Sequence, residues 1–256
     1  MSRSKPNRAE NPAVRFFEWK AQKGVLQYYD KANKENVEVP IPFKFLVLDQ
    51  LHTVKGGTKV QGSYVGFYSN EVRDIKRETI TLRSKNGIEA EGTYQEVKAH
   101  RGAKYTKSIY IAFDNGGELE IGNIQAIGSA NSAWIEFSNS GVNLNTCAVT
   151  IKDRKKIEGE QSDYYEPVFE ASECPQKLNE LAWKLDGKLQ EYLSDYFGRG
   201  ARENDEYAQG EVSANRFPDD PDLVPSDEEE AAGRGWNEQD GTPVENDTDK
   251  QPAIGW

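Results

Sequence analysis

Residues 40–51 read Pro-Ile-Pro-Phe-Lys-Phe-Leu-Val-Leu-Asp-Gln-Leu, and this stretch decides the class of the fold. Alternate positions from Phe43 to Val47 are apolar, and two of the positions beside them, Leu46 and Leu48, are apolar as well. An extended chain with this pattern buries both of its faces. The stretch therefore predicts a strand near the centre of a β barrel or sandwich.

Short runs of the same β type surround this stretch and are separated by glycine and asparagine. Lys85-Asn86-Gly87 and the residues 114–117 are hairpin-turn signals, because Asn and Gly accept positive φ. This density of short strands favours a small antiparallel barrel or sandwich. We expect the further strands at 14–20, 24–29 (a hairpin with the first), 64–68, 78–83, 88–94, 105–113, 119–127, 133–137, 146–151 and 164–169.

One amphipathic helix is expected over about 175–197. Pro175 suits a first helical position and Gly198 suits the residue that follows a helix. The apolar stripe predicts packing against the sheet, with a homo-oligomer contact as the alternative. It consists of Leu178, Leu181, Ala182, Leu185, Leu189, Tyr192, Leu193 and Tyr196.

The last fifth of the chain differs sharply in charge from the rest. Residues 203–256 hold sixteen acidic side chains against three basic ones, which leaves 29 basic and 27 acidic residues in 1–202. This composition is typical of a disordered segment. We therefore divide the chain into a flexible basic arm (1–12), one folded domain (13–200) and an acidic tail (201–256) with an apolar tip.

Several classes of protein are not indicated. No run reaches the roughly 18 apolar residues that span a bilayer, and the N-terminus has no apolar signal-peptide core. We expect a soluble cytoplasmic protein whose two cysteines, Cys147 and Cys174, are buried thiols. The two histidines have no metal-ligand spacing, and no phosphate loop or nucleophile elbow occurs. The sequence predicts a non-enzyme without cofactor or metal.

Two stretches mix basic and aromatic residues, as single-stranded nucleic acid requires, because cations follow the phosphates and aromatic rings stack on bases. The alternative is that the aromatics are core and the lysines a solvated face. In the second stretch, alternation places Tyr105 and Lys107 on one face. The candidates are Lys55, Lys59, Tyr64, Phe67, Tyr68, Arg73, Lys76 and Arg77, then Lys98, Arg101, Lys104, Tyr105 and Lys107.

A third aromatic run, around residues 15–20, is assigned mainly to the core. Alternation buries Phe17 and Trp19 and leaves Arg15 and Phe16 outward. Trp134 is also expected in the core.

These features together resemble the single-stranded-DNA-binding proteins of bacteria and tailed phages. Residues 42–49, 69–72 and 105–112 are similar to stretches of the phage members. The resemblance implies an OB-like barrel with extra hairpins. It also implies binding and protection of single-stranded DNA, without strong sequence preference, during replication or recombination in the cytoplasm of a phage host.

The tip of the tail departs from the bacterial pattern, in which several acidic residues precede Ile-Pro-Phe. Here the chain ends in Ile254-Gly255-Trp256, and the dense acidic run lies upstream. The resemblance implies that this tip recruits a replication or recombination partner, which need not be the usual host one. We further expect the tail to compete with DNA for the basic body. The alternative function is a structural or virion-associated β-sandwich protein whose tail only confers solubility.

Overall fold

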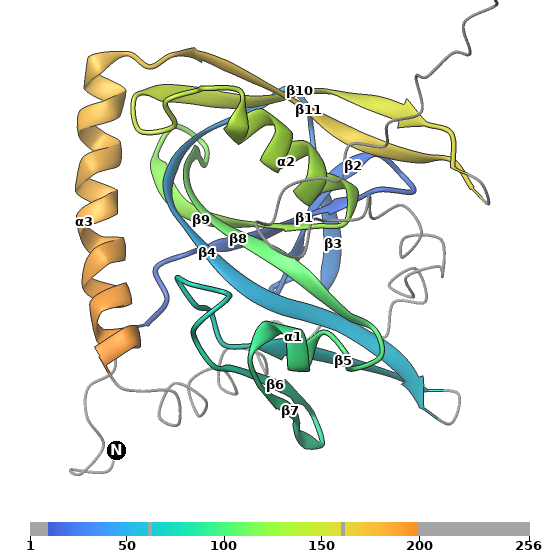
Figure 1. The fold of residues 1–256 in the computed structure, drawn as a ribbon. Coiled ribbons are helices and arrows are strands. Elements are labelled where there is room, and N and C mark those ends of the chain that lie inside the picture. The colour runs from blue at the N-terminus through green and yellow to red at the C-terminus, as the bar shows by residue number, and fades with distance from the viewer. Residues whose placement is uncertain (1–9, 61–62, 160–161, 199–256) are drawn as a thin grey trace, which may run out of the picture.

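The computed structural model describes residues 10–60, 63–159 and 162–198 of the 256-residue chain (Figure 1). Three helices and eleven strands occur in these residues. The helices are α1 (Tyr94–Val97), α2 (Ser129–Asn139) and α3 (Gln176–Gly198). The strands are β1 (Arg15–Lys20), β2 (Val25–Asp30), β3 (Glu35–Val39), β4 (Phe43–Val60), β5 (Ser63–Ser69), β6 (Ile80–Ser84), β7 (Gly87–Gly92), β8 (Ala103–Asp114), β9 (Leu119–Ile127), β10 (Cys147–Ile157) and β11 (Tyr164–Glu173).

All eleven strands belong to one sheet, in the order β3-β2-β1-β9-β8-β4-β5-β6-β7, with β10 paired to β4 and β11 to β10. The expected β class is therefore confirmed. The sheet is mixed rather than purely antiparallel, because β1 runs parallel to β9. It is an open sheet and does not close through a continuous ladder.

Residues 43–51, the expected central strand, form the first part of β4, which lies between neighbours on both sides. β4 pairs with β5, β8 and β10. Its register with β8 shifts between Val47 and Asp49, so the alternation of its side chains changes there. Leu46 and Leu51 are five positions apart, so regular alternation would place them on opposite faces. Because of the register shift, both pack beneath α3.

The two long helices cover opposite faces of the curved sheet (Figure 1). On the inner face, Trp134 of α2 packs with Phe45 and Ile109. Phe17 and Trp19 are buried in the same cluster, as predicted. On the outer face, Leu189 and the other buried residues of α3 pack over β4, β8 and β9, which confirms the expected helix. One position of the predicted stripe, Leu181, is 40 % exposed.

The expected strand at 133–137 is wrong, because these residues belong to α2. A short apolar run cannot distinguish a strand from a buried helix by periodicity alone. Here Ala130 and Trp134, four positions apart, lie on one helical face, and both are buried. Two short elements, β3 and α1, were not predicted: β3 has only two alternating apolar residues, Val37 and Val39, and α1 is a single turn of four residues.

Strands β5, β6 and β7 with α1 form an extension that has a small core of its own. Val54 of β4 and Val97 of α1 contribute to this core together with Ile80 and Leu82. The extension lies between β4 and β8 in the sequence, and so it is positioned by the central strands on both sides. None of the helices in the described part of the chain is long and apolar enough to cross a membrane.

Candidate nucleic-acid interface

Five of the predicted site residues lie on one face of the sheet. In the strand registers, Lys55 of β4 is opposite Tyr68 of β5 and also opposite Lys104 of β8, and Lys59 is opposite Tyr64. Paired residues project to the same side, and positions two apart along a strand share a face. This is the outer face, because Leu51, four positions before Lys55, packs beneath α3. We call these five residues the outer strip: Lys55, Lys59, Tyr64, Tyr68 and Lys104.

The outer strip is continuous with β9 and β1. Lys55 Nζ donates a hydrogen bond to Gln125 Oε1 of β9. Gln125 is opposite Glu18 of β1, so the same face extends across two further strands. Burial raises the pKa of Tyr64, and the charge of Glu18 raises it further. The Tyr64 hydroxyl therefore stays neutral and does not repel a phosphate.

The glycine pair of β4 has a structural reason. The ring of Tyr64 lies over Gly57, and a Cβ at that position would collide with the Tyr64 hydroxyl. A Cβ on Gly56, where φ is +151°, would meet the carbonyl oxygen of Gly102. The two glycines thus allow β4 to pass close beneath an aromatic ring and beside a turn, rather than forming a phosphate-binding loop.

Tyr105 and Lys107 lie on the opposite, inner face. They share a face as expected, but it is the face away from Lys104. His52 Nδ1 and Tyr105 Oη are 2.5 Å apart. Burial, with the charge of Lys107, lowers the pKa of His52 to about 4, and burial also lowers the pKa of Lys107. These side chains form a half-buried polar cluster and do not belong to the outer strip.

Phe67 was predicted to stack on bases, and the structure contradicts this. Its side chain is 4 % exposed in the core of the β5–β7 extension. Its ring meets His100 edge-on, with 5.0 Å between the ring centroids. Alternation explains the error, because Phe67 points to the inner side while its neighbour Tyr68 points to the outer side. No face of the Phe67 ring is available to a base.

The remaining predicted cations lie on exposed loops. Arg73 pairs with Asp49 at 3.2 Å and its guanidinium carbon lies 5.2 Å from the ring centroid of Phe197. Arg77 pairs with Asp74 at 3.6 Å. Arg73 and Arg77 are thus paired with neighbouring carboxylates, and all five loop cations lie outside the strands of the outer strip. The set is Arg73, Lys76 and Arg77 after β5, with Lys98 and Arg101 between α1 and β8.

A buried polar network joins α3 to the sheet next to the outer strip. Glu71 accepts hydrogen bonds from the hydroxyls of Ser108 and Tyr110, the second at 2.8 Å. The backbone N–H of Glu71 donates to Tyr196 Oη of α3 at 2.9 Å. Burial raises the pKa of Glu71. The carboxylate of Glu71 thus binds β8, and its backbone N–H binds Tyr196 of α3. Through these contacts the network anchors α3 to the sheet.

Sequence reasoning missed two features. One is a cleft of about 350 Å³ beside the outer strip, bordered by β1 and β2. Its only signal was the outward assignment of Phe16. The outward assignment of Arg15 is wrong, because Arg15 is two positions from Phe17 and lies over the rings of Tyr28 and Phe113 on the inner face. The other is an exposed basic run on the β10–β11 hairpin, visible in the sequence as 152–156. Two of its lysines are paired, Lys152 with Glu170 at 3.0 Å and Lys156 with Asp163.

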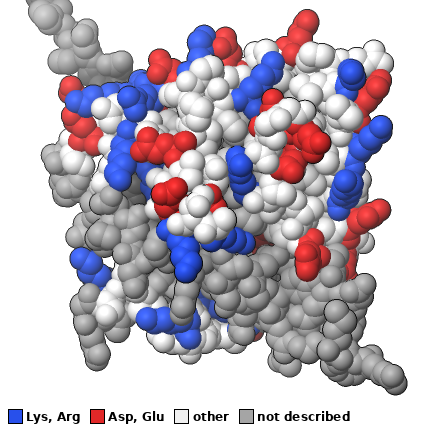
Figure 2. All heavy atoms as spheres, turned by 180° about the vertical axis from the view of Figure 1, so that it is seen from behind, with Lys and Arg blue, Asp and Glu red and all other residues white. Residues whose placement is uncertain are grey.

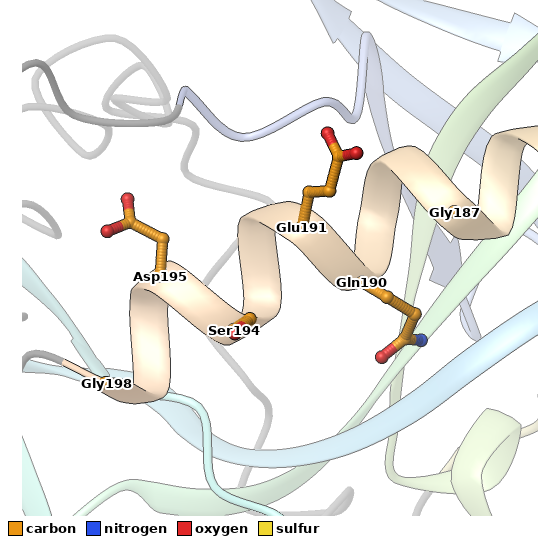
Figure 3. A pocket seen from close by; sticks show the side chains of 6 residues that line it. All are labelled: Gly187, Gln190, Glu191, Ser194, Asp195 and Gly198. Carbon is orange, nitrogen blue, oxygen red and sulfur yellow. The ribbon is translucent and has the colours of Figure 1, made fainter.

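Two further surfaces offer little for an anionic ligand. A shallow hollow runs along α3, where Glu191 and Asp195 project from the same side of the helix (Figure 3). On the face seen in Figure 2, basic and acidic side chains are interspersed rather than gathered into one field. Within the described residues, no group of three or more His, Cys, Asp or Glu side chains is placed to hold a metal ion. Cys147 and Cys174 are half-buried free thiols.

The proposed partner-binding tip, Ile254, Gly255 and Trp256, lies outside the described residues, as does the acidic tail. Comparison with known proteins finds no match: no family model, no curated protein and no solved structure is similar to this chain.

Proposed function

We propose that this protein binds single-stranded DNA without strong sequence preference and protects it during phage DNA replication or recombination. The observation that carries the proposal is the outer strip. Three lysines and two tyrosines from β4, β5 and β8 share one face of the sheet. Lysines neutralise backbone phosphates, and tyrosine rings stack on any base, which together give affinity without sequence readout.

A single strand suits this surface better than a duplex. Stacking on Tyr64 or Tyr68 requires a base whose face is exposed, and in a duplex both faces are covered by neighbouring base pairs. The tyrosines are therefore the reason for preferring single-stranded nucleic acid, and the lysines set the dependence on salt.

We infer an OB-like arrangement for the central strands. β4, β8 and β9 are consecutive antiparallel neighbours, α2 follows β9, and β10 returns to pair with the start of β4 before β11 pairs with β10. Tyr165 of β11 donates its backbone N–H to the carbonyl oxygen of Ala21 at 2.8 Å, which brings the last strand against the end of β1.

The position of the outer strip fits this inference. An OB-fold binds oligonucleotides on the face of its second and third strands and on the loops after its first and fourth strands. Those elements correspond here to β8, β9, the β5–β7 extension and the β10–β11 hairpin. The outer strip includes Lys104 of β8 and the two tyrosines of β5 in the extension, and the basic run at 152–156 lies on the hairpin.

The acidic tail provides regulation in this proposal. Its sixteen carboxylates are covalently tethered to the body, so they compete with DNA phosphates at a high effective concentration. The disorder expected from the composition of these 54 residues would give them a reach of about 40 Å, from 5–6 Å times the square root of length. Bound DNA would displace the tail and free the Ile254–Trp256 tip for a partner.

The test is an electrophoretic mobility titration of the full chain, and of residues 1–202, against single-stranded DNA, duplex DNA and single-stranded RNA at two salt concentrations. The proposal predicts salt-sensitive binding that is strongest for single strands. Absence of binding to any nucleic acid at low salt would refute it, and would favour the structural or virion-associated alternative.

A further inference from the structure

The cleft bordered by β1 and β2 is lined by aromatic, carboxamide and charged side chains, a mixture that suits a ligand site. It is continuous with the outer strip. Its volume is about 350 Å³, within the usual range for small-molecule sites. Lys55 belongs to both, because it lines the cleft and also lies at the centre of the outer strip. A strand lying along the strip would therefore pass the mouth of the cleft.

Two aromatic rings form one wall of the cleft. The register of β1 with β2 begins at the pair Phe17 and Tyr28, and continuing it by one step would place Phe16 opposite Tyr29. Side chains in such a pair are neighbours on one face of the sheet. Phe16 and Tyr29 both line the cleft. They form an aromatic platform on the outer face, opposite the buried ring of Phe17.

Two carboxamides supply polar groups beside this platform. Gln27 and Gln125 line the cleft, and each residue is 8 % exposed. Gln125 Oε1 already accepts from Lys55 Nζ, so Gln125 offers its NH2 group, while Gln27 offers both a donor and an acceptor. This mixture matches the edge of a nucleobase rather than the acceptor-only surface of a phosphate. Because both residues are largely buried, their positions are defined by the surrounding strands.

The charges around the cleft also disfavour a free anion as the ligand. Arg15, Lys31 and Lys55 line it, but so do the carboxylates Glu18 and Asp30. Asp30 is engaged in its turn, where it accepts from the backbone N–H of Ala32 at 2.8 Å. Arg15 is held over the ring of Tyr28, 4.4 Å from its centroid. This near balance of positive and negative charges favours a neutral heterocycle within the cleft. The phosphate of the same nucleotide would then lie on the outer strip.

We propose that the cleft is a nucleobase-binding site. One base of the bound strand stacks on Phe16 and Tyr29, and the carboxamides of Gln27 and Gln125 hydrogen-bond to its edge. This inference rests on the proposed function and extends it, since a base held in a polar cleft gives a modest base preference at one position of an otherwise unspecific site.

The experiment compares two ligands of equal length and charge: oligo(dT), and the same phosphodeoxyribose backbone with every base removed. The full chain is titrated with each ligand, alongside the Phe16→Ala variant. Loss of a stacking aromatic should weaken binding to oligo(dT) roughly 5- to 100-fold. Binding to the abasic strand should not change, and neither should the salt dependence. Trp183→Ala is the matched control, because Trp183 is an aromatic on α3 with 62 % exposure and should affect neither ligand.

A second variant keeps the inference testable if Phe16→Ala does not fold. Gln27→Leu preserves size but removes the donor and acceptor, so it should change the ratio of affinities for oligo(dA), oligo(dC) and oligo(dT). Equal losses on both strands for Phe16→Ala, or unchanged ratios for Gln27→Leu, would overturn the nucleobase site and leave strand binding intact. Failure of the unsubstituted chain to bind oligo(dT) would overturn the proposed function as well.

Discussion

The two faces of the β4–β8 ladder carry the same kinds of residue but lie in different environments. On the outer face, Lys55 lies opposite Lys104, beside the tyrosines of β5. On the inner face, Lys107 lies opposite His52, where burial lowers the pKa of both groups. The comparison shows that basic-aromatic composition along a stretch does not define a binding surface. The strand alternation divides each stretch between solvent and interior, and only one half remains available for a ligand.

The neighbours Phe67 and Tyr68 give the sharpest test of this division, with the largest expected effect. Phe67→Ala removes a buried aromatic side chain and should lower the free energy of unfolding by about 3–4 kcal/mol. The affinity of the folded protein for single-stranded DNA should not change, because Phe67 has no exposed ring face. Urea unfolding and DNA titration of each variant provide the two readouts.

Tyr68→Ala is the counterpart and should give the reverse pattern. It lies on the outer face and is only half-buried, so the loss of unfolding free energy should be smaller. Its affinity for single-stranded DNA should fall roughly 5- to 100-fold with little change in salt dependence. If Phe67→Ala weakened DNA binding as much as Tyr68→Ala, the assignment of faces would be wrong.

Charge reversal of the outer strip is the next largest effect. Lys55→Glu combined with Lys104→Glu should weaken binding roughly 30- to 100-fold at low salt, and the slope of log K against log salt should fall by about 1.4, since two fewer phosphates are neutralised. Lys177→Glu with Lys188→Glu makes the same change in net charge on exposed positions of α3 and is the matched control. Equal losses in the two double variants would mean that net charge alone governs binding.

Removal of the tail tests whether the tail competes with DNA for the outer strip. Deleting residues 203–256 should tighten binding to single-stranded DNA about tenfold at low salt, where charges are least screened. The same deletion in the Lys55→Glu, Lys104→Glu background should have little effect, because the tail then has no basic strip to occupy. Deleting only Ile254–Trp256 should leave DNA affinity unchanged. Weaker binding by a folded tail-less protein would contradict competition.

The smallest expected effect concerns the inner face: burial of His52 should make the free energy of unfolding depend on pH. The pKa of His52 is about 4 in the fold, against an ordinary value of 6.5, so the unfolded chain takes up the proton first. His52 thus contributes stability that is complete above pH 6.5 and is lost as the pH falls toward 4. After allowance for its partial exposure, the loss should be about 1–2 kcal/mol.

The measurement for His52 is urea unfolding at pH 7 and pH 5, for the unsubstituted chain and for His52→Gln. The carboxylates titrate equally in both proteins, so the difference between them isolates the histidine. Stability curves that fall in parallel with pH would show that His52 is not desolvated.

Much of the secondary structure was predictable because it depends on local pattern. The strand at 119–127 and the hairpin formed by β1 and β2 were found at or near their observed bounds. The helix α3 was found from its apolar stripe, its proline and its glycine. The region 133–137 was mistaken for a strand because five residues are too few to separate a period of 2 from one of 3.6.

The candidate site was predictable only as a set of residues, not as a surface. Alternation places Tyr68 and Phe67 on opposite faces, and likewise Lys104 and Lys107, but the sequence did not say which of the two faces is exposed. The cleft was missed because its walls come from β1, β2, β4 and β9, which are distant along the chain.

The sequence by itself determined the β class, the central strand at 43–51, the C-terminal helix and the reversal of charge at residue 203, because each depends on composition or on short-range periodicity. Only the tertiary structure decided which side of each strand faces solvent. It did so through the register of β4 with β5 and β8 and through the irregularity between Val47 and Asp49. A shift of one residue moves every following side chain to the other face, and which face is covered depends on where α2 and α3 pack.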